Sequence, residues 1–187
     1  MAGTNPVCLS PVQRILGAVQ FAAQKHMTQK RKGMMGEPYI NHLLEVAGLI
    51  AESSEDLDEN LIVAALLHDT VEDTRTTYEE VREKFGDDVA GLVAEVTDDK
   101  SLPKATRKQL QIDNAPHKST RAATIKLADK ISNLRAILAS PPADWSVQRQ
   151  REYFEWAKRV VDGLPPANAI LKAEFEKTHA RLDELGS

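Results

Sequence analysis

The stretch from Leu61 to Leu67 reads Leu-Ile-Val-Ala-Ala-Leu-Leu and runs directly into His68-Asp-Thr-Val-Glu-Asp73. Such an apolar run can be a buried strand. This one is rich in Leu and Ala, and the segment that contains it continues past about ten residues, which favours a helix. Asp58 and Glu59 suit the first turn of a helix, where the macrodipole favours acidic side chains. Because a helix that is apolar on every side must be buried, we predict a central helix that ends in ionisable residues.

The rest of the chain also shows the apolar spacing of amphipathic helices, so the expected fold class is all-α. The basic stretch 28–36 contains two glycines and is expected to be a loop. Thr77 and Glu80 match a capping box, and Gly86 is expected to end that helix. About eight to ten helices are predicted, the others spanning approximately residues 11–26, 39–53, 89–96, 102–114, 120–139, 146–161 and 167–185.

The composition of the chain narrows its class. With 187 residues, of which 42% are hydrophobic and 28% charged, we expect one globular domain over 1–187 with no membrane span. The N-terminal stretch lacks a secretory pattern, so a cytoplasmic location is expected. Cys8 is the single cysteine, so a metal site must rely on His and carboxylates. A net charge of −4 argues against a nucleic-acid partner.

Four ionisable residues crowd the end of the central helix. On one continuous helix His68 would lie over Glu72, and Asp69 over Asp73. Acidic groups at a helix C-terminus are opposed by the macrodipole at a cost of ~0.3–1 kcal/mol each, which a bound divalent cation would reverse. The alternative is a solvated helix end with no ligand.

Two distant residues are further candidates for a metal site. His42 stands near the start of a helix, and Asp129 interrupts an apolar stripe, where a carboxylate is rarely buried unless it is paired or metal-bound. Asn133 follows Asp129 by one turn. The alternatives are a polar patch for His42 and, for Asp129, an ion pair with Lys126, Lys130 or Arg135. His26 is interpreted as structural.

Basic residues form two clusters in this acidic chain, around Lys30–Lys32 and around Lys104–Lys108. Each could be an ordinary charged surface or a patch for an anionic ligand. Arg31 is the preferred contact for a nucleotide base, because a guanidinium group can stack on an aromatic ring and can also form two hydrogen bonds to one phosphate. Tyr153 and Trp156 share a helix face, and core packing is the simpler explanation, more so for Trp156.

Five blocks together resemble a known family, in the order in which they occur. His42, His68-Asp69 and Asp129 resemble the HD superfamily of metal-dependent phosphohydrolases, and the longer strings resemble the hydrolase domain of RelA/SpoT enzymes, especially the small single-domain alarmone hydrolases. The similarity runs from about residue 12 to 171, which implies a single HD-domain helical bundle. The blocks are Gly36-Glu-Pro-Tyr-Ile-Asn-His42, Leu66-Leu-His-Asp-Thr-Val-Glu-Asp73, Glu95-Val-Thr-Asp-Asp-Lys-Ser-Leu-Pro-Lys104, Lys126-Leu-Ala-Asp-Lys-Ile-Ser-Asn133 and Glu152-Tyr-Phe-Glu-Trp-Ala157.

The resemblance implies a role for each matching residue. One divalent ion, manganese in this family, is expected on four ligands: His42, His68, Asp69 and Asp129. The acidic pair Glu72 and Asp73 is expected to orient or deprotonate the attacking water. The expected substrate contacts are Arg31, Lys32, Lys104, Asn133 and Tyr153.

The implied reaction removes the 3′-pyrophosphate from guanosine tetra- or pentaphosphate, without a synthetase activity. The partner would be this small purine nucleotide. Alternatives are NADPH 2′-phosphatase or adenosine-alarmone hydrolase activity in the same site, or a non-catalytic alarmone-binding module. Four residues depart from the family pattern and bear on ligand fit: Met34, Met35, Leu43 and Arg75.

Overall fold

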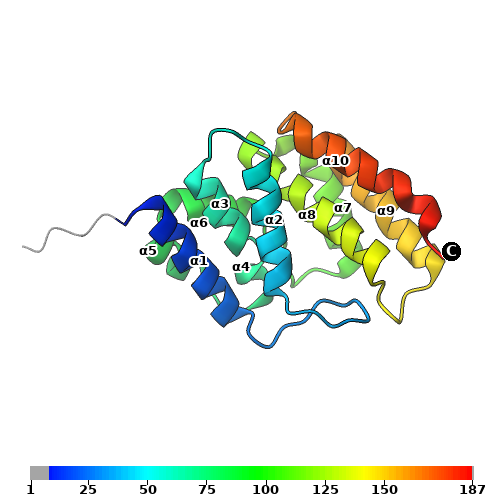
Figure 1. Ribbon diagram of the computed structural model, residues 1–187, viewed down its shortest axis with the longest axis horizontal. Coiled ribbons are helices and arrows are strands. Elements are labelled where there is room, and N and C mark those ends of the chain that lie inside the picture. Colours follow the sequence, from blue (N-terminus) through cyan, green and yellow to red (C-terminus); the bar gives the residue numbers. More distant parts are fainter. Residues whose placement is uncertain (1–8, 187) are drawn as a thin grey trace, which may run out of the picture.

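The computed structural model describes residues 9–186, which form ten α-helices and two short 3₁₀ helices (Figure 1). The all-α expectation is confirmed, and Cys8 lies outside the described residues. The α-helices are α1 Pro11–Lys25, α2 Ile40–Glu52, α3 Glu59–Leu67, α4 Thr70–Asp73, α5 Tyr78–Phe85, α6 Asp87–Val96, α7 Lys104–Asp113, α8 Thr120–Ala139, α9 Val147–Gly163 and α10 Ala169–His179. The 3₁₀ helices are η1 Ala115–His117 and η2 Ala180–Glu184.

Helix α3 lies in the core, as its sequence predicted. All six residues from Ile62 to Leu67 are buried, because α3 packs against α1, α2, α6 and α8. Helix α8 is the second central element and packs against α2, α6, α9 and α10 (Figure 1). Its buried residues include polar ones, among them Lys126, Asp129 and Ser132. The core therefore carries polar side chains at the junction of α2, α3 and α8.

The segment after α3 does not continue as one helix, and this expectation was wrong. α3 ends at Leu67, Asp69 precedes the short helix α4 with φ −100° and ψ −2°, and α4 ends at Thr74 in extended backbone. The Asp73 amide still bonds the Asp69 carbonyl, at 2.8 Å. The break lies where the ionisable residues begin, and the chain stays buried across it, since His68 is 3% exposed and Thr70 is completely buried.

Helix ends follow the local signals in most places. Ser10 forms a full capping box with Gln13, and Ser119 and Ser146 cap α8 and α9. Thr77 caps α5 through the Glu80 amide, but the Glu80 carboxylate pairs with Lys25. The last predicted helix is shorter than expected, because the chain tightens into η2 after His179.

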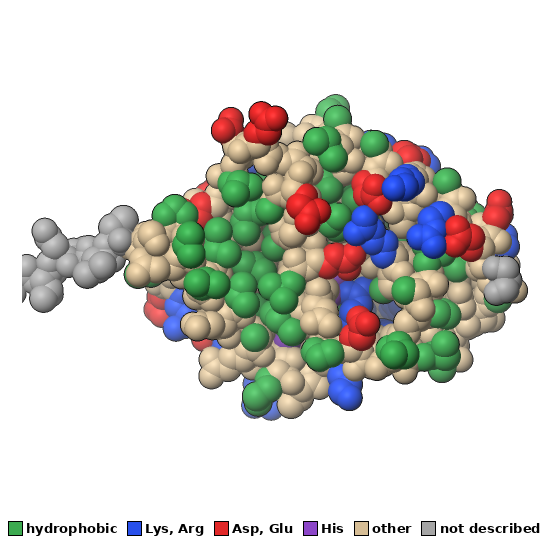
Figure 2. Space-filling model, viewed as in Figure 1, with side chains coloured by type: hydrophobic (Ala, Val, Ile, Leu, Met, Phe, Trp, Pro, Cys, Tyr) green, Lys and Arg blue, Asp and Glu red, His purple; other side chains and the backbone are tan. Residues whose placement is uncertain are grey.

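Charged and apolar side chains gather in separate regions of the surface seen in Figure 2. Over α1 and α2 the surface is mostly apolar, while Lys, Arg, Asp and Glu gather over α8 to α10 (Figure 2). The exposed apolar residues of α1 and α2 include Val12, Leu16 and Leu44. None of the helices in residues 9–186 has the length and apolarity needed to cross a membrane.

Candidate active site

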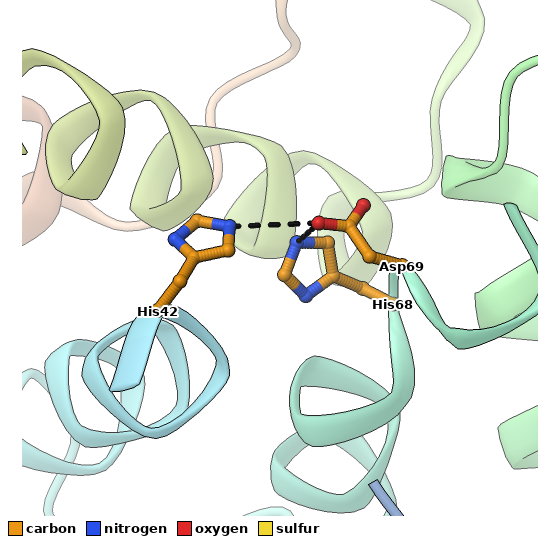
Figure 3. A group of neighbouring side chains, drawn as sticks. All are labelled: His42, His68 and Asp69. Atoms are coloured by element: carbon orange, nitrogen blue, oxygen red, sulfur yellow. Dashed lines mark ion pairs between the residues drawn. The ribbon is translucent and has the colours of Figure 1, made fainter. Parts of the chain in front are cut away.

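The predicted metal ligands come together from α2, the α3–α4 turn and α8. His42 Nε2 lies 3.3 Å from Asp129 Oδ1 and 3.6 Å from Asp69 Oδ2. His68 Nε2 lies 3.2 Å from Asp69 Oδ2 and 3.9 Å from Asp129 Oδ1. Figure 3 shows both imidazole rings turned towards the Asp69 carboxylate. Residues far apart in the sequence thus aim nitrogen and oxygen atoms at one point.

Hydrogen bonds fix the tautomer of His42. Its Nδ1 lies 2.8 Å from Ser132 Oγ, whose hydroxyl donates to Glu45 Oε2 at 2.6 Å. Because the Ser132 proton is committed to Glu45, Nδ1 of His42 must carry a proton and donate to Ser132. The lone pair of His42 is therefore on Nε2, which faces the carboxylates.

The backbone orients His68 in the same way. Its Nδ1 lies 2.8 Å from the carbonyl oxygen of Ala65, which can only accept a hydrogen bond. Nε2 of His68 is buried and makes no hydrogen bond of good geometry within the described residues. A buried polar atom without a partner calls for an explanation, and a metal ion facing Nε2 supplies one.

The electrostatics of the cluster favour a cation. Burial opposes ionisation of Asp69, but His68 and His42 outweigh it and hold the pKa of Asp69 well below its usual range. The Asp129 pKa is also lowered against burial, chiefly by Lys130, whose Nζ lies 3.0 Å from Oδ2. Burial lowers the pKa of His68, but the charges of Asp69 and Asp129 raise it to about 9.

This donor set fits a divalent metal ion. Ligand atoms of His42, His68 and Asp69 all lie within 4.8 Å of one another, and Asp129 adds an oxygen beside them. Imidazole nitrogens mixed with carboxylate oxygens suit borderline divalent ions. The expected ion pair of Asp129 with Lys130 forms through Oδ2, while Oδ1 lies beside His42. Arg135 pairs with Glu45 and Glu174 instead.

Tyr39 is a neighbour of the cluster that the sequence reasoning missed. Its hydroxyl donates to Asp69 Oδ2 at 2.5 Å, and burial together with nearby carboxylates raises the pKa of Tyr39. The ring stacks on His26 at 5.1 Å between centroids, which agrees with a structural role for His26. The signal was its place in the first motif block, three residues before His42.

The acidic pair lies beside the cluster, each carboxylate held by its own donors. Glu72 Oε2 accepts from the Asp98 amide at 3.0 Å, and burial raises the pKa of Glu72. Asp73 Oδ2 accepts from Gln29 Nε2 at 2.7 Å, and Asp73 also pairs with Lys100. Both carboxylates line the same cleft as Asp69 and Asp129.

That cleft has a volume of about 700 Å³, within the range of nucleotide-sized ligands. It is bordered by the basic loop, α7, α8 and α9. All five expected substrate contacts line it: Arg31, Lys32, Lys104, Asn133 and Tyr153. The cations of the cleft suit a ligand of several negative charges.

The basic loop is held in place by its own backbone and by α8. Lys30 and Pro38 form an isolated antiparallel bridge, which closes the loop. A side chain at Gly33 would collide with the carbonyl of Ser140, so glycine permits the close approach to the end of α8. Arg31 then reaches Asn133, with its NH2 3.1 Å from Oδ1. Asn133 in turn donates to Asp129 Oδ1 at 2.6 Å.

Aromatic residues form part of the cleft wall. Trp156 lines the cleft as well as packing on the core, so the core interpretation was incomplete. Trp145 was missed, and its ring carries the Arg149 guanidinium at 4.5 Å. Tyr153 lies between them, with centroids 5.6 Å from Trp145 and 5.1 Å from Trp156. Periodicity alone does not separate a cleft wall from a core face.

The four departures from the family pattern lie away from the ligand atoms. Leu43 is completely buried and belongs to the hydrophobic core. Met34, Met35 and Arg75 are exposed. None of these four lines the cleft.

The fold and the histidine–aspartate cluster define a class. A family model described as HD domain matches residues 18–155, so the chain belongs to the HD-domain family. Within it the chain belongs with the guanosine-3′,5′-bis(diphosphate) 3′-pyrophosphohydrolases named MESH1. The Xenopus tropicalis relative is 50% identical over 170 residues, covering 91% of this chain and 94% of the relative. The Homo sapiens relative is 50% identical over 163 residues, covering 87% and 91%.

Two solved structures are also similar to this chain. One, reported as "A metazoan ortholog of SpoT hydrolyzes ppGpp and plays a role in starvation responses", is 44% identical to this chain, with a TM-score of 0.87. It covers 96% of this chain and 98% of its own. A second, the crystal structure of lmo0812 from Listeria monocytogenes, is 31% identical with a TM-score of 0.64 and covers 79% of this chain.

Proposed function

We propose that this protein is a metal-dependent pyrophosphohydrolase that removes the 3′-pyrophosphate of guanosine tetra- and pentaphosphate. The products are GDP or GTP and pyrophosphate. The observation that carries the proposal is the cluster of His42, His68, Asp69 and Asp129 at one side of a cationic cleft of about 700 Å³. Relatives of about 50% identity that bear the name of this activity support it.

The four ligands would hold one divalent ion, and we propose Mn²⁺. Such an ion supplies Lewis acidity and a water of lowered pKa. The protein's part is to present the ligand atoms: Ser132 and the Ala65 carbonyl accept from the two Nδ1 atoms, so both Nε2 atoms point inwards, and that of His68 would bind the ion after losing its proton. Asp69 and Asp129 bring the negative charge that the ion balances.

Glu72 and Asp73 are proposed to orient the attacking water and take its proton. Burial raises the pKa of Glu72, which strengthens it as a base. The Asp98 amide holds Oε2 at 3.0 Å, while within residues 9–186 Oε1 accepts no hydrogen bond and has Lys100 Nζ at 4.0 Å. Arg107 NH1 lies 3.8 Å from Oε1 and orients it without tight pairing.

The remaining cleft residues are proposed to bind substrate. Arg31 and Lys32 would meet the base and phosphates from the basic loop, and Lys104 would meet phosphate from α7. Asn133 would contact substrate beside the metal, and Tyr153 would contact it from the aromatic wall. All five line one cleft, which supports a single ligand that spans them.

No observation favours the alternatives. The relatives are named for 3′-pyrophosphate hydrolysis rather than for a 2′-phosphatase or adenosine-alarmone activity. A non-catalytic binding module has no use for two carboxylates in the cleft beside the ligand cluster. We also propose that residues 1–187 form one hydrolase domain, that it acts in the cytoplasm, and that its partner is this small nucleotide.

The test is turnover by the full chain, purified with Mn²⁺ and supplied separately with guanosine tetraphosphate, an adenosine alarmone and NADPH. We expect GDP and pyrophosphate from the first, with the highest kcat/KM. Release of orthophosphate from NADPH as the dominant reaction, or no turnover of any substrate with several divalent ions, would overturn the proposal.

A further inference from the structure

A second, smaller pocket of about 240 Å³ adjoins the catalytic cleft, between the α6–α7 loop, α7, α8 and α9. Four residues line both the pocket and the cleft, so they form the partition between them: Asp98, Arg107, Gln111 and Lys126. Glu72 lies on the cleft side of this partition, 3.8 Å from Arg107. The pocket is therefore next to the proposed catalytic pair but is not part of the cleft.

Three cations line the pocket, Arg107, Lys118 and Lys126, and only Arg107 has a carboxylate partner within residues 9–186, Glu72 at 3.8 Å. Lys126 is only 7% exposed, and neither Lys126 nor Lys118 forms an ion pair within residues 9–186. Lys118 donates a hydrogen bond to the carbonyl oxygen of Glu95. Nε of Arg107 is buried and has no hydrogen-bond partner in this part of the chain. Buried positive charges are unfavourable unless an anion pairs with them.

The carboxylates that line the pocket, Asp98 and Asp99, form no ion pair with these lysines within residues 9–186. Asp98 Oδ2 accepts from Gln111 Nε2 at 2.5 Å, and Asp99 Oδ1 accepts from the Ser101 amide at 2.9 Å. Burial, and then the charge of Lys126, lowers the pKa of Lys118. The charges of Glu95 and Asp98 raise this pKa and offset part of the effect, and an anion bound beside Lys118 and Lys126 would stabilise both lysines.

We infer that this pocket binds a small phosphate anion: orthophosphate, or the pyrophosphate that the neighbouring cleft releases. The pocket is too small for a nucleotide, since sites for drug-sized ligands start near ~300 Å³. Leu110, Val160 and Leu164 contribute apolar side chains to its lining, and its charged residues are three cations and two carboxylates, Asp98 and Asp99. The pyrophosphate source rests on the proposed function, whereas the anion site itself does not.

A bound anion here would act on the enzyme from outside the substrate site. It would draw Arg107 and Lys126 away from Glu72, which both cations now approach from the partition. Pyrophosphate would then inhibit in a way that saturating substrate does not fully reverse.

Lys118 gives a clean test, because it lines the pocket and not the cleft. Titration calorimetry of the full chain in EDTA, with pyrophosphate and with orthophosphate, should show binding that Lys118→Met weakens about tenfold, the effect expected from losing one charged hydrogen bond. Lys118→Arg should retain binding, and Lys32→Met, which alters only the cleft, should leave it unchanged. Thermal unfolding of each variant shows whether it is folded.

The two ligands distinguish the source of the anion. Tighter binding of pyrophosphate points to the product, and equal binding points to free phosphate; both support the site. No binding, or binding lost in Lys32→Met but kept in Lys118→Met, overturns it.

Kinetics separate this inference from the proposed function. Lys118→Met should leave kcat unchanged without added pyrophosphate and should remove the part of the inhibition that substrate cannot reverse. Anion binding that depends on Lys118 in a protein without turnover would refute only the proposed function. Turnover with purely competitive inhibition, equal in both proteins, would refute only the anion pocket.

Discussion

Ser132 Oγ lies 2.8 Å from Nδ1 of His42, a residue ninety positions earlier in the chain. Because Ser132 donates its own proton to Glu45, it accepts the His42 proton and leaves Nε2 unprotonated for a metal. A hydroxyl on α8 thus determines the tautomer of the proposed ligand His42 on α2.

Ser132→Ala should weaken metal binding. Without the acceptor, the His42 ring loses both its tautomer preference and its orientation, and loss of such a partner typically costs about 10–100-fold in affinity. Competition with a coloured chelator measures this. Ser54→Ala, in an exposed turn, is the matched control and should bind as the wild type does.

Asp129→Ala should lower the metal content of the purified protein, because it removes an oxygen 3.3 Å from His42 Nε2. Elemental analysis measures the content. Asp87→Ala, at a carboxylate with 91% side-chain exposure, is the control. Full metal retention in Asp129→Ala would exclude Asp129 as a ligand.

Glu72→Gln should keep the metal and lose turnover. The amide is nearly the same shape but cannot take a proton, and general-base groups contribute about 10²–10⁴-fold. Steady-state rates and metal content are measured on the same sample. Glu79→Gln, which is exposed, should be unaffected. Undiminished turnover would show that Glu72 does not serve the water.

Metal binding should release a proton. His68 has a pKa raised to about 9 in the metal-free protein, so near pH 7.5 it is charged and must lose its proton to become a ligand. Apparent affinity should therefore rise with pH up to about 9. Calorimetry in buffers of different ionisation heat counts the protons, and a heat independent of buffer would contradict this.

The same shift predicts how the stability of the metal-free protein depends on pH. The folded-state pKa of His68 is above its unfolded value of 6.5, so its contribution is complete below pH 6.5 and is lost as pH rises through about 9. The melting temperature in EDTA should fall across this range. His68→Gln should make the fall shallower.

The sequence by itself determined most of the helices and named the residues that we propose as ligands. Helix formation depends on neighbours three and four residues apart, so apolar spacing located α3 and α8, with α8 at its predicted bounds. The motif blocks predicted His42, His68, Asp69 and Asp129 without the fold, because each block is a short continuous run of residues.

Tertiary structure decided what those residues do together. Whether Trp156 faces a core or a cleft depends on which helices pack beside α9, and helical spacing is the same in both cases. The break after Leu67 falls inside the packed interior, since His68 and Thr70 beyond it are buried, and spacing along the sequence does not mark it. The tautomers of His42 and His68, and the paired state of Asp129, depend on atoms that only folding brings within hydrogen-bond distance.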